Sequence, residues 1–360
     1  EKYLNQNKMP IEEIINNSSE DNNKEVLKDS DNNDYVNDLR PKILKEYVGQ
    51  IKVVDSLRTA IKASEARNEA MEHVLFHGPP GLGKTTLAHV ISKEKKSNLV
   101  VTSGPSLEKP ADIVGLLSNL SEGDVLFIDE IHRISKGVEE YFYSAMEDFK
   151  VDFITGSGTF AKTLTFPINK FTLVGATTRV GMLSSPLRDR FGLTYHLDFY
   201  NLEELSAIIK RSSNILNVKI DDLATKQIAM RSRGTPRIAN RLLRRVRDFH
   251  QVNSKTDKID GDVASKAMEL EGVDQKGLDR LDRQYLLTLS KNYNGGPAGI
   301  EALAATLNEE SQTLMDVVEP YLLKIGFIIR TPSGRKVTID GLKYAGIQVR
   351  KKDENQKRMF

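Results

Sequence analysis

A glycine-rich segment between two apolar runs constrains the fold of this chain more than any other feature. Residues 78–85 read Gly-Pro-Pro-Gly-Leu-Gly-Lys-Thr and match the phosphate-loop pattern GxxxxGK[ST]. The apolar run Val74–Phe76 before it predicts a strand, and the segment that begins at Leu87 predicts a helix. Because glycines let backbone N–H groups turn inward at a helix N-terminus, this arrangement predicts a site for phosphate groups.

The residues of this loop have separate expected roles toward ATP or ADP. Gly81 and Gly83 are expected to bring their backbone N–H groups close to phosphate oxygens. Lys84 can reach the β- and γ-phosphates, and Thr85 can ligate Mg²⁺. Thr86 follows at the start of the helix and is included among the nucleotide-binding residues.

A second segment supplies the acidic groups that nucleotide hydrolysis needs. Val125–Ile128 is a run of large apolar residues, which is typical of a central parallel strand covered on both faces. Asp129 follows directly and is expected to hold Mg²⁺, while Glu130 would orient or deprotonate the attacking water. Alone, such an acidic pair is more often a helix cap, but with the phosphate loop it predicts an ATPase. A GTPase is disfavoured because residues 169–172 read Asn-Lys-Phe-Thr and do not complete the guanine pattern NKxD.

Composition limits the kind of protein that surrounds these segments. The chain has 360 residues, 39% of them hydrophobic, which is enough for two or three domains with their own cores. It has no cysteine, which excludes disulfides and thiolate metal sites, and no run approaches the roughly 18 apolar residues of a membrane span. The net charge of +2 is uneven: residues 1–38 carry four Lys and ten Asp or Glu, a balance of −6, so the remainder carries +8. Such a basic body could face nucleic acid.

The pattern along the chain predicts three folded regions between two polar ends. Residues 1–38 lack periodic hydrophobicity and are expected to form a disordered acidic tail. In 39–200, apolar strands alternate with helices, which favours an α/β fold with a parallel sheet. Residues 201–272 show helical periodicity, and 273–349 combine helices with a hairpin, which suggests a winged-helix module. Residues 350–360 are expected to form a basic C-terminal tail.

The pattern also predicts where individual elements begin and end. Strands are expected at Val74–His77, Leu99–Thr102, Val125–Ile128, Leu173–Ala176 and Tyr195–Phe199. Helices are expected at Val53–Glu69, Glu203–Leu216, Leu223–Arg231, Pro236–Val252 and Gly261–Glu271. Two β-rich runs around a Pro-Ser-Gly turn predict a hairpin over 327–339.

Three further residues are suited to an ATP site. Thr178 follows the predicted strand Leu173–Ala176, where a hydroxyl could meet the γ-phosphate or the attacking water. Arg190 could reach the nucleotide of a neighbouring subunit, and a surface ion pair with Asp189 is the alternative. Arg237 follows a Gly-Thr-Pro segment that opens a helix, and it would point back at the nucleotide.

Taken in order from Leu39 to Ile347, these segments resemble the bacterial RuvB family, AAA+ ATPases that drive Holliday-junction branch migration. The most specific segments are Arg233–Arg241, which reads RGTPRIANR, and Glu319–Leu322, which reads EPYL and precedes the basic hairpin. The resemblance implies an α/β AAA+ P-loop NTPase domain with a parallel sheet, followed by an all-α lid domain and a C-terminal winged-helix domain.

The resemblance also implies roles for single residues. The adenine pocket would be lined by Leu39, Arg40 and Tyr200. Thr178 corresponds to the sensor 1 residue, Arg190 to the arginine finger that acts on the neighbouring subunit, and Arg237 to sensor 2.

Partners follow from the same resemblance. The segment Phe153–Phe166 corresponds to a hairpin with which family members dock the junction-binding partner RuvA, whereas its pattern alone predicts an ordinary sheet hairpin. Arg330 and Arg335 correspond to winged-helix positions that approach DNA, and together with Lys336 they are expected to project from a tight turn into solvent. The implied assembly is a homo-hexameric ring on duplex DNA or a Holliday junction. It would be linked indirectly to a RuvC-type resolvase, away from membranes, and be cytoplasmic, or organellar if the source is eukaryotic.

Two other functions remain open on the sequence. An ATP-dependent clamp loader or initiator would share the DNA-binding assembly but not junction branch migration. A protein-remodelling ATPase would respond to polypeptide and would not need a C-terminal winged helix, so the predicted hairpin and the basic body count against it.

Overall fold

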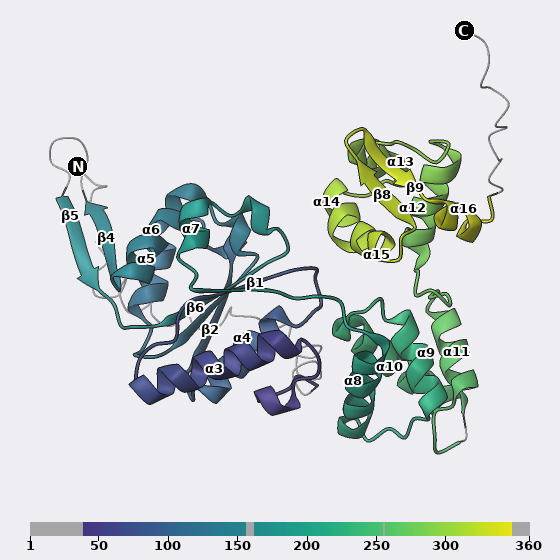
Figure 1. The fold of residues 1–360 in the computed structure, drawn as a ribbon, viewed down its shortest axis with the longest axis horizontal. Coiled ribbons are helices and arrows are strands. Elements are labelled where there is room, and N and C mark those ends of the chain that lie inside the picture. The colour runs from purple at the N-terminus through teal and green to yellow at the C-terminus, as the bar shows by residue number, and fades with distance from the viewer. Residues whose placement is uncertain (1–38, 156–161, 255, 348–360) are drawn as a thin grey trace, which may run out of the picture. The chain divides into compact units, whose positions relative to one another are not determined.

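The computed structural model describes residues 39–155, 162–254 and 256–347 (Figure 1). The tails expected at 1–38 and 350–360 lie outside these described residues. Within the described ranges, no helix is long and apolar enough to cross a membrane.

The first region is built on a five-stranded sheet with the strand order β2-β3-β6-β1-β7. Its strands are β1 (Val74–His77), β2 (Leu99–Ser103), β3 (Val125–Asp129), β6 (Thr172–Thr177) and β7 (Leu193–His196). Every neighbouring pair is parallel, as the alternation of strands and helices predicts. The sequence predicts the first four strands to within one residue at each end, whereas β7 begins and ends earlier than expected.

Alternate residues of these strands pack into two separate cores, one on each face of the sheet. Val74 and Phe76 join a core with residues of α3 and α4. Leu75 joins a second core with residues of α5, α6 and α7. Figure 1 shows these two groups of helices on opposite sides of the sheet. The helices are α3 (Ile51–Arg67), α4 (Lys84–Glu94), α5 (Pro110–Ser118), α6 (Lys136–Glu147) and α7 (Ser185–Asp189). Because both faces are covered, the loops after the carboxyl ends of β1, β3 and β6 form the open edge where ligands bind in such sheets.

A separate two-stranded antiparallel sheet contains the segment expected to form a hairpin at 153–166. Its strands are β4 (Lys150–Thr155) and β5 (Lys162–Pro167), and Lys150 pairs with Pro167 at the base. Residues 156–161 lie outside the described residues. Val151 at the base is buried, while Phe166 opposite it is 45% exposed.

The second region is helical and matches the helix boundaries expected from periodicity closely. It comprises α8 (Leu202–Ile215), α9 (Asp222–Arg231), α10 (Pro236–Asn253) and α11 (Gly261–Leu270). The side chain of Asn201 caps α8 and that of Asp260 caps α11, each by accepting a hydrogen bond from a backbone N–H in the first turn.

The third region combines short helices with a hairpin around its own core. Its helices are α12 (Arg280–Lys291), α13 (Ile300–Leu307), α14 (Ser311–Thr313), a π-helical turn (Leu314–Val318), α15 (Glu319–Lys324) and α16 (Ile339–Tyr344). The hairpin is formed by β8 (Ile328–Thr331) and β9 (Gly334–Val337), so the turn lies where the sequence predicts it. Leu289, Leu303 and Leu322 are fully buried in this core.

Candidate nucleotide site

The phosphate loop joins the end of β1 to the start of α4, as the pattern predicts. Gly78 and Gly83 have φ values of +138° and +103°, which L side chains rarely adopt. A Cβ on Gly78 would lie 2.5 Å from the backbone oxygen of Leu197, and a Cβ on Gly83 would lie 2.5 Å from the Tyr47 hydroxyl. Both glycines are therefore required by the shape of the loop itself.

Lys84 lies on the first turn of α4 and is only 8% exposed. Its Nζ donates hydrogen bonds to the backbone oxygens of Gly78 at 2.7 Å and Pro79 at 2.9 Å. Burial lowers the pKa of Lys84 to about 8, with attraction to Asp129 acting against this and repulsion from Arg237 adding to it. Burial thus disfavours the charged form of the ammonium at the loop. A bound anion, such as a phosphate group, would favour that charged form.

The carboxylates expected for hydrolysis lie at and beyond the end of β3. Asp129 ends the strand, and its Oδ1 accepts a hydrogen bond of 2.9 Å from the backbone N–H of Glu130. Glu130 has a left-handed backbone with φ +49°, which turns the chain sharply after the strand. Its carboxylate forms an ion pair with Arg133 at 2.9 Å, and both side chains are about half exposed.

The donor set near the loop fits Mg²⁺. Thr85 on the first turn of α4 and Asp129 at the end of β3 offer hard oxygen ligands, which Mg²⁺ prefers. Among the described residues, no group of three or more His, Cys, Asp or Glu side chains could hold a metal ion by itself.

The end of β6 brings two threonines beside the carboxylates of β3. Thr177 is buried, and its hydroxyl lies 2.9 Å from Nδ1 of His132 and accepts a 2.9 Å hydrogen bond from the backbone N–H of Arg179. Burial lowers the pKa of His132, which favours its neutral form. Since the Thr177 hydroxyl is engaged in this way, the half-buried Thr178 is the candidate for a contact with nucleotide.

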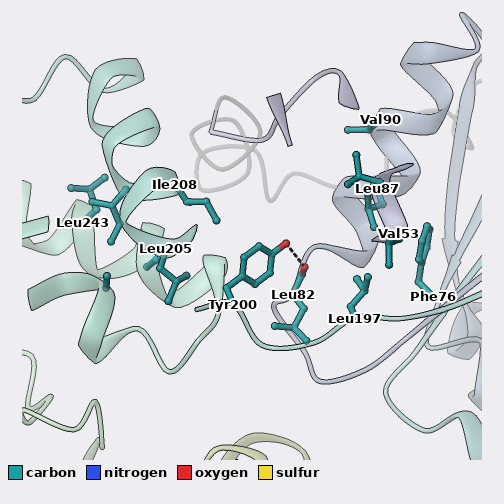
Figure 2. Close-up of a cluster of buried hydrophobic side chains, with 14 of the residues drawn as sticks. Val53, Phe76, Leu82, Leu87, Val90, Leu197, Tyr200, Leu205, Ile208 and Leu243 are labelled. Carbon is teal, nitrogen blue, oxygen red and sulfur yellow. Dashed lines mark hydrogen bonds between the residues drawn. The ribbon is translucent and has the colours of Figure 1, made fainter. Parts of the chain in front are cut away.

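A pair of tyrosines supports the phosphate loop from the other side. The Tyr200 hydroxyl lies 3.0 Å from that of Tyr47 and donates a 3.2 Å hydrogen bond to the backbone oxygen of Leu82 (Figure 2). Burial raises the pKa of Tyr200 to about 12, so the hydroxyl keeps its proton. Tyr200 therefore lies at the loop, and its contact with adenine stays a prediction. Leu39 is buried and Arg40 is half-buried.

Sequence reasoning gave Tyr47 no role. It lies in the segment Glu46–Gln50, which supports the family resemblance, but its contact with the loop joins residues far apart in the sequence and no local pattern indicates it.

The two remaining arginines are held differently. Arg237 lies at the start of α10, its side chain is exposed, and its backbone N–H lies 3.4 Å from the backbone oxygen of Gly81 in the phosphate loop. Arg190 packs its guanidinium 4.5 Å from the centre of the Tyr143 ring and forms an ion pair with Glu147 at 3.3 Å. The expected alternative, a pair between Arg190 and Asp189, is replaced by this pair with α6.

The winged-helix hairpin holds its arginines otherwise than the sequence predicts. Arg330 and Arg335 are partners across β8 and β9, and the Nε of each donates to Glu319 at 2.8 Å. Glu319 is fully buried, and the Arg335 side chain is only 17% exposed. The expectation that Arg335 projects into solvent is wrong, because its guanidinium is paired with the buried carboxylate of Glu319, which would otherwise be an uncompensated buried charge. Arg330 is 49% exposed, and Lys336 is intermediate.

Comparison with known proteins assigns the chain to a family. Three consecutive family models match: the P-loop domain of the Holliday junction DNA helicase RuvB at residues 39–197, the RuvB AAA lid domain at 200–274, and the RuvB C-terminal winged-helix domain at 275–346.

Individual relatives agree with these models. The RuvB branch migration complex subunit of Desulfosudis oleivorans is 52% identical over 89% of this chain and 94% of its own length. That of Pseudothermotoga lettingae is 55% identical over 83% of this chain and 87% of its own length. The solved structure of the Thermotoga maritima RuvB Holliday junction branch migration motor is 51% identical, has a TM-score of 0.80, and matches 87% of this chain and 100% of that one. Three domain models in unbroken order and relatives of this similarity show that the chain belongs to the RuvB family of P-loop ATPases, the Holliday junction branch-migration motors.

Proposed function

We propose that this chain is the ATP-hydrolysing subunit of a Holliday junction branch migration complex, and that it drives duplex DNA through a homo-hexameric ring. The proposal divides the chain into an ATPase domain at 39–200, a lid at 201–272 and a winged helix at 273–349. The single observation that carries it is that one chain of this family contains both a complete phosphate loop and a winged helix.

The proposed chemistry assigns one task to each group of the site. The backbone N–H groups of Gly81 and Gly83 would hold phosphate oxygens, and Lys84 would balance the charge of the β- and γ-phosphates. Thr85 and Asp129 would hold Mg²⁺, which supplies charge neutralisation at the transferred phosphoryl group.

Hydrolysis itself would depend on residues around the γ-phosphate. Glu130 would turn a water molecule toward the phosphorus, and Thr178 would contact the γ-phosphate or that water. Arg237 would sense the nucleotide from the lid, and Arg190 would act on a neighbour's site. The remaining nucleotide contacts are proposed for Thr86, Leu39, Arg40 and Tyr200.

DNA would be held through its phosphates, because a motor that translocates must bind without regard to base sequence. Arg330 and Lys336, which keep exposed surface at the winged-helix hairpin, are the proposed contacts, and Arg335 would support them from beneath. Hydrolysis would tilt the lid against the ATPase domain and move the winged helix along the duplex.

The proposed partners follow from the antiparallel hairpin formed by β4 and β5. This hairpin, within 153–166, would dock a RuvA-type junction-binding protein, and the exposed ring of Phe166 offers it apolar surface. A RuvC-type resolvase would be linked only through the assembled junction. The proposed place of action is the cytoplasm, or an organelle if the source is eukaryotic.

Substituting Glu130→Gln tests this function directly. The variant keeps the loop and should bind ATP with unchanged affinity, but hydrolysis should fall by at least about 10² because the water loses its general base. Branch migration of a synthetic four-way junction, measured with the junction-binding partner present, should fall in parallel.

Glu140→Gln, an exposed change on α6, is the matched control and should behave as the wild type. Wild-type protein that hydrolyses ATP but never migrates a junction would favour a clamp loader or initiator. Stimulation of hydrolysis by polypeptide and not by DNA would favour a remodelling ATPase.

A further inference from the structure

The turn between α9 and α10 contains an arginine whose side chain reaches the winged-helix region. Arg233 has a left-handed backbone with φ +53° and is 7% exposed. Its Nε donates a 2.9 Å hydrogen bond to the backbone oxygen of Gly277, and its guanidinium contacts the carboxylates of Asp279 and Asp282. The guanidinium also lies 5.6 Å from the centre of the Tyr321 ring on α15.

The acidic partners of Arg233 fix the start of the first winged-helix helix. Asp279 caps α12, and the carboxylate of Asp282 accepts a hydrogen bond of 2.9 Å from the backbone N–H of Asp279. Asp282 is fully buried, and burial raises its pKa to about 7 while the charge of Arg233 acts to lower it. Because desolvation offsets much of the Coulombic gain of a buried ion pair, this contact is weak evidence for added stability.

The same turn contacts the nucleotide site at its other end. The backbone oxygen of Gly234 accepts a 2.9 Å hydrogen bond from the N–H of Tyr200, and the N–H of Arg237 lies 3.4 Å from the oxygen of Gly81. Only three residues therefore separate the arginine bound to the winged helix from the arginine at the phosphate loop.

The packing around this turn leaves little freedom. A Cβ on Gly277 would lie 2.7 Å from the backbone oxygen of Arg231. The segment between α11 and α12, which contains Gly277, is therefore in direct contact with the turn between α9 and α10. The Nζ of Lys324 on α15 lies 4.2 Å from the centre of the Phe199 ring. A displacement of residues 231–237 would thus be passed on to α12 and α15.

We infer that Arg233 is a positioning residue that fastens the winged helix to the turn preceding Arg237, so that lid and winged helix move as one body when nucleotide changes. The inference rests on the proposed function, and it assigns to the contacts of Arg233 the step that converts hydrolysis into DNA movement. It predicts that loss of Arg233 uncouples the two activities without abolishing either binding event.

The absence of cysteine from the chain allows a direct test by fluorescence energy transfer. Val252 on α10 and Ile339 on α16 are 83% and 58% exposed, so Val252→Cys with Ile339→Cys places one dye on each region of the full chain. In the otherwise unaltered protein, the distribution of energy-transfer efficiencies should be narrow and the same with ATP or ADP. In the Arg233→Ala background it should broaden and depend on nucleotide.

Kinetics separate positioning from catalysis. Arg233→Ala should keep the KM for ATP and basal turnover within about twofold, while the number of base pairs migrated per ATP falls at least tenfold. Arg233→Lys, which keeps the charge but loses the forked donors, should recover part of that yield. Arg241→Ala, an exposed change on α10, is the control.

A second variant covers the case in which Arg233→Ala does not fold. Asp279→Asn keeps a good helix cap but removes one charge from the ion-pair cluster, and it should broaden the distribution of energy-transfer efficiencies to a smaller extent.

An unchanged distribution of transfer efficiencies, with an unchanged number of base pairs migrated per ATP, in the folded variants would overturn the inference. A parallel loss of turnover and migration without broadening would overturn it as well. If wild-type protein migrates no junction, the proposed function fails. The energy-transfer measurement still shows whether the lid and the winged helix move as one body.

Discussion

Lys84 shows how burial of one residue can make nucleotide binding depend on pH. Its pKa of about 8 lies below the ordinary 10.5, so between these values the unfolded chain holds a proton that the folded, nucleotide-free chain has lost. This contribution to stability therefore increases as pH rises through that window. Binding of ATP has the opposite sign, because the phosphates require the protonated ammonium.

We predict that ATP affinity falls as pH rises above about 8, by up to about tenfold per pH unit, with uptake of a proton on binding. Isothermal titration in buffers of different ionisation enthalpy measures both quantities. Lys84→Arg is the matched control, because a guanidinium keeps its charge throughout this range and should give a flat profile. A wild-type profile as flat as that of Lys84→Arg would show that the lysine does not titrate at the loop.

At the level of elements, the winged-helix hairpin contains residues with two different tasks. Arg335 is mostly buried against Glu319, which also accepts a hydrogen bond from Tyr285. Arg335→Ala should leave an acceptor of this buried carboxylate unpaired and lower the local free energy of unfolding by about 1–3 kcal/mol. Faster hydrogen exchange in α12 and α15 of the full chain is the measurement.

Substituting Lys336→Ala should act on DNA and not on stability. Loss of one phosphate contact lowers affinity equally for unrelated duplexes and flattens the log–log salt dependence by about one unit. Adding Arg330→Ala should flatten it further. A salt slope that neither substitution alters would move the DNA contact to another part of the surface.

The elements themselves differ in how much the sequence predicts. β1 and β3 are recognised because they are buried on both faces and read as continuous apolar runs. β7 lies at the edge of the sheet and alternates in burial, so the run from Leu193 to Phe199 does not show where pairing stops. Pairing stops at His196 because its partner on β1, His77, is the last residue before the phosphate loop turns away.

The site residues also differ in how well the sequence predicts them. The places of Lys84, Asp129 and Glu130 at the start of α4 and the end of β3 are predictable because the motifs fix their spacing after a strand, while their chemical roles stay predictions. The contact of Arg335 with Glu319 and that of Arg233 with Asp282 join distant segments, and a one-dimensional pattern contains no signal for such pairs. For this reason, the position of a basic residue near a turn is weak evidence that its side chain is exposed to solvent.

At the scale of the whole molecule, the proposed ring would have each subunit supply Arg190 to its neighbour's site. Arg190 is kept in place by α6 and α7 through Tyr143, Glu147 and the backbone oxygen of Pro186. These contacts would present it at the surface of one subunit beside the next subunit's nucleotide. An arginine supplied in this way is worth about 10³–10⁵ in rate in related NTPases.

Mixing two inactive variants distinguishes action on a neighbour from action within one subunit. Arg190→Ala should bind ATP but lose turnover, and Lys84→Ala should lose ATP binding while keeping its arginine. Where the two meet, the intact loop of one faces the intact arginine of the other, so mixing should restore part of the hydrolysis. Arg188→Ala is the control, since that side chain is exposed and contacts Asp189 only at 3.9 Å. If co-assembly is confirmed by sizing and no ratio restores turnover, Arg190 acts within its own subunit, and the ring is not needed to complete the site.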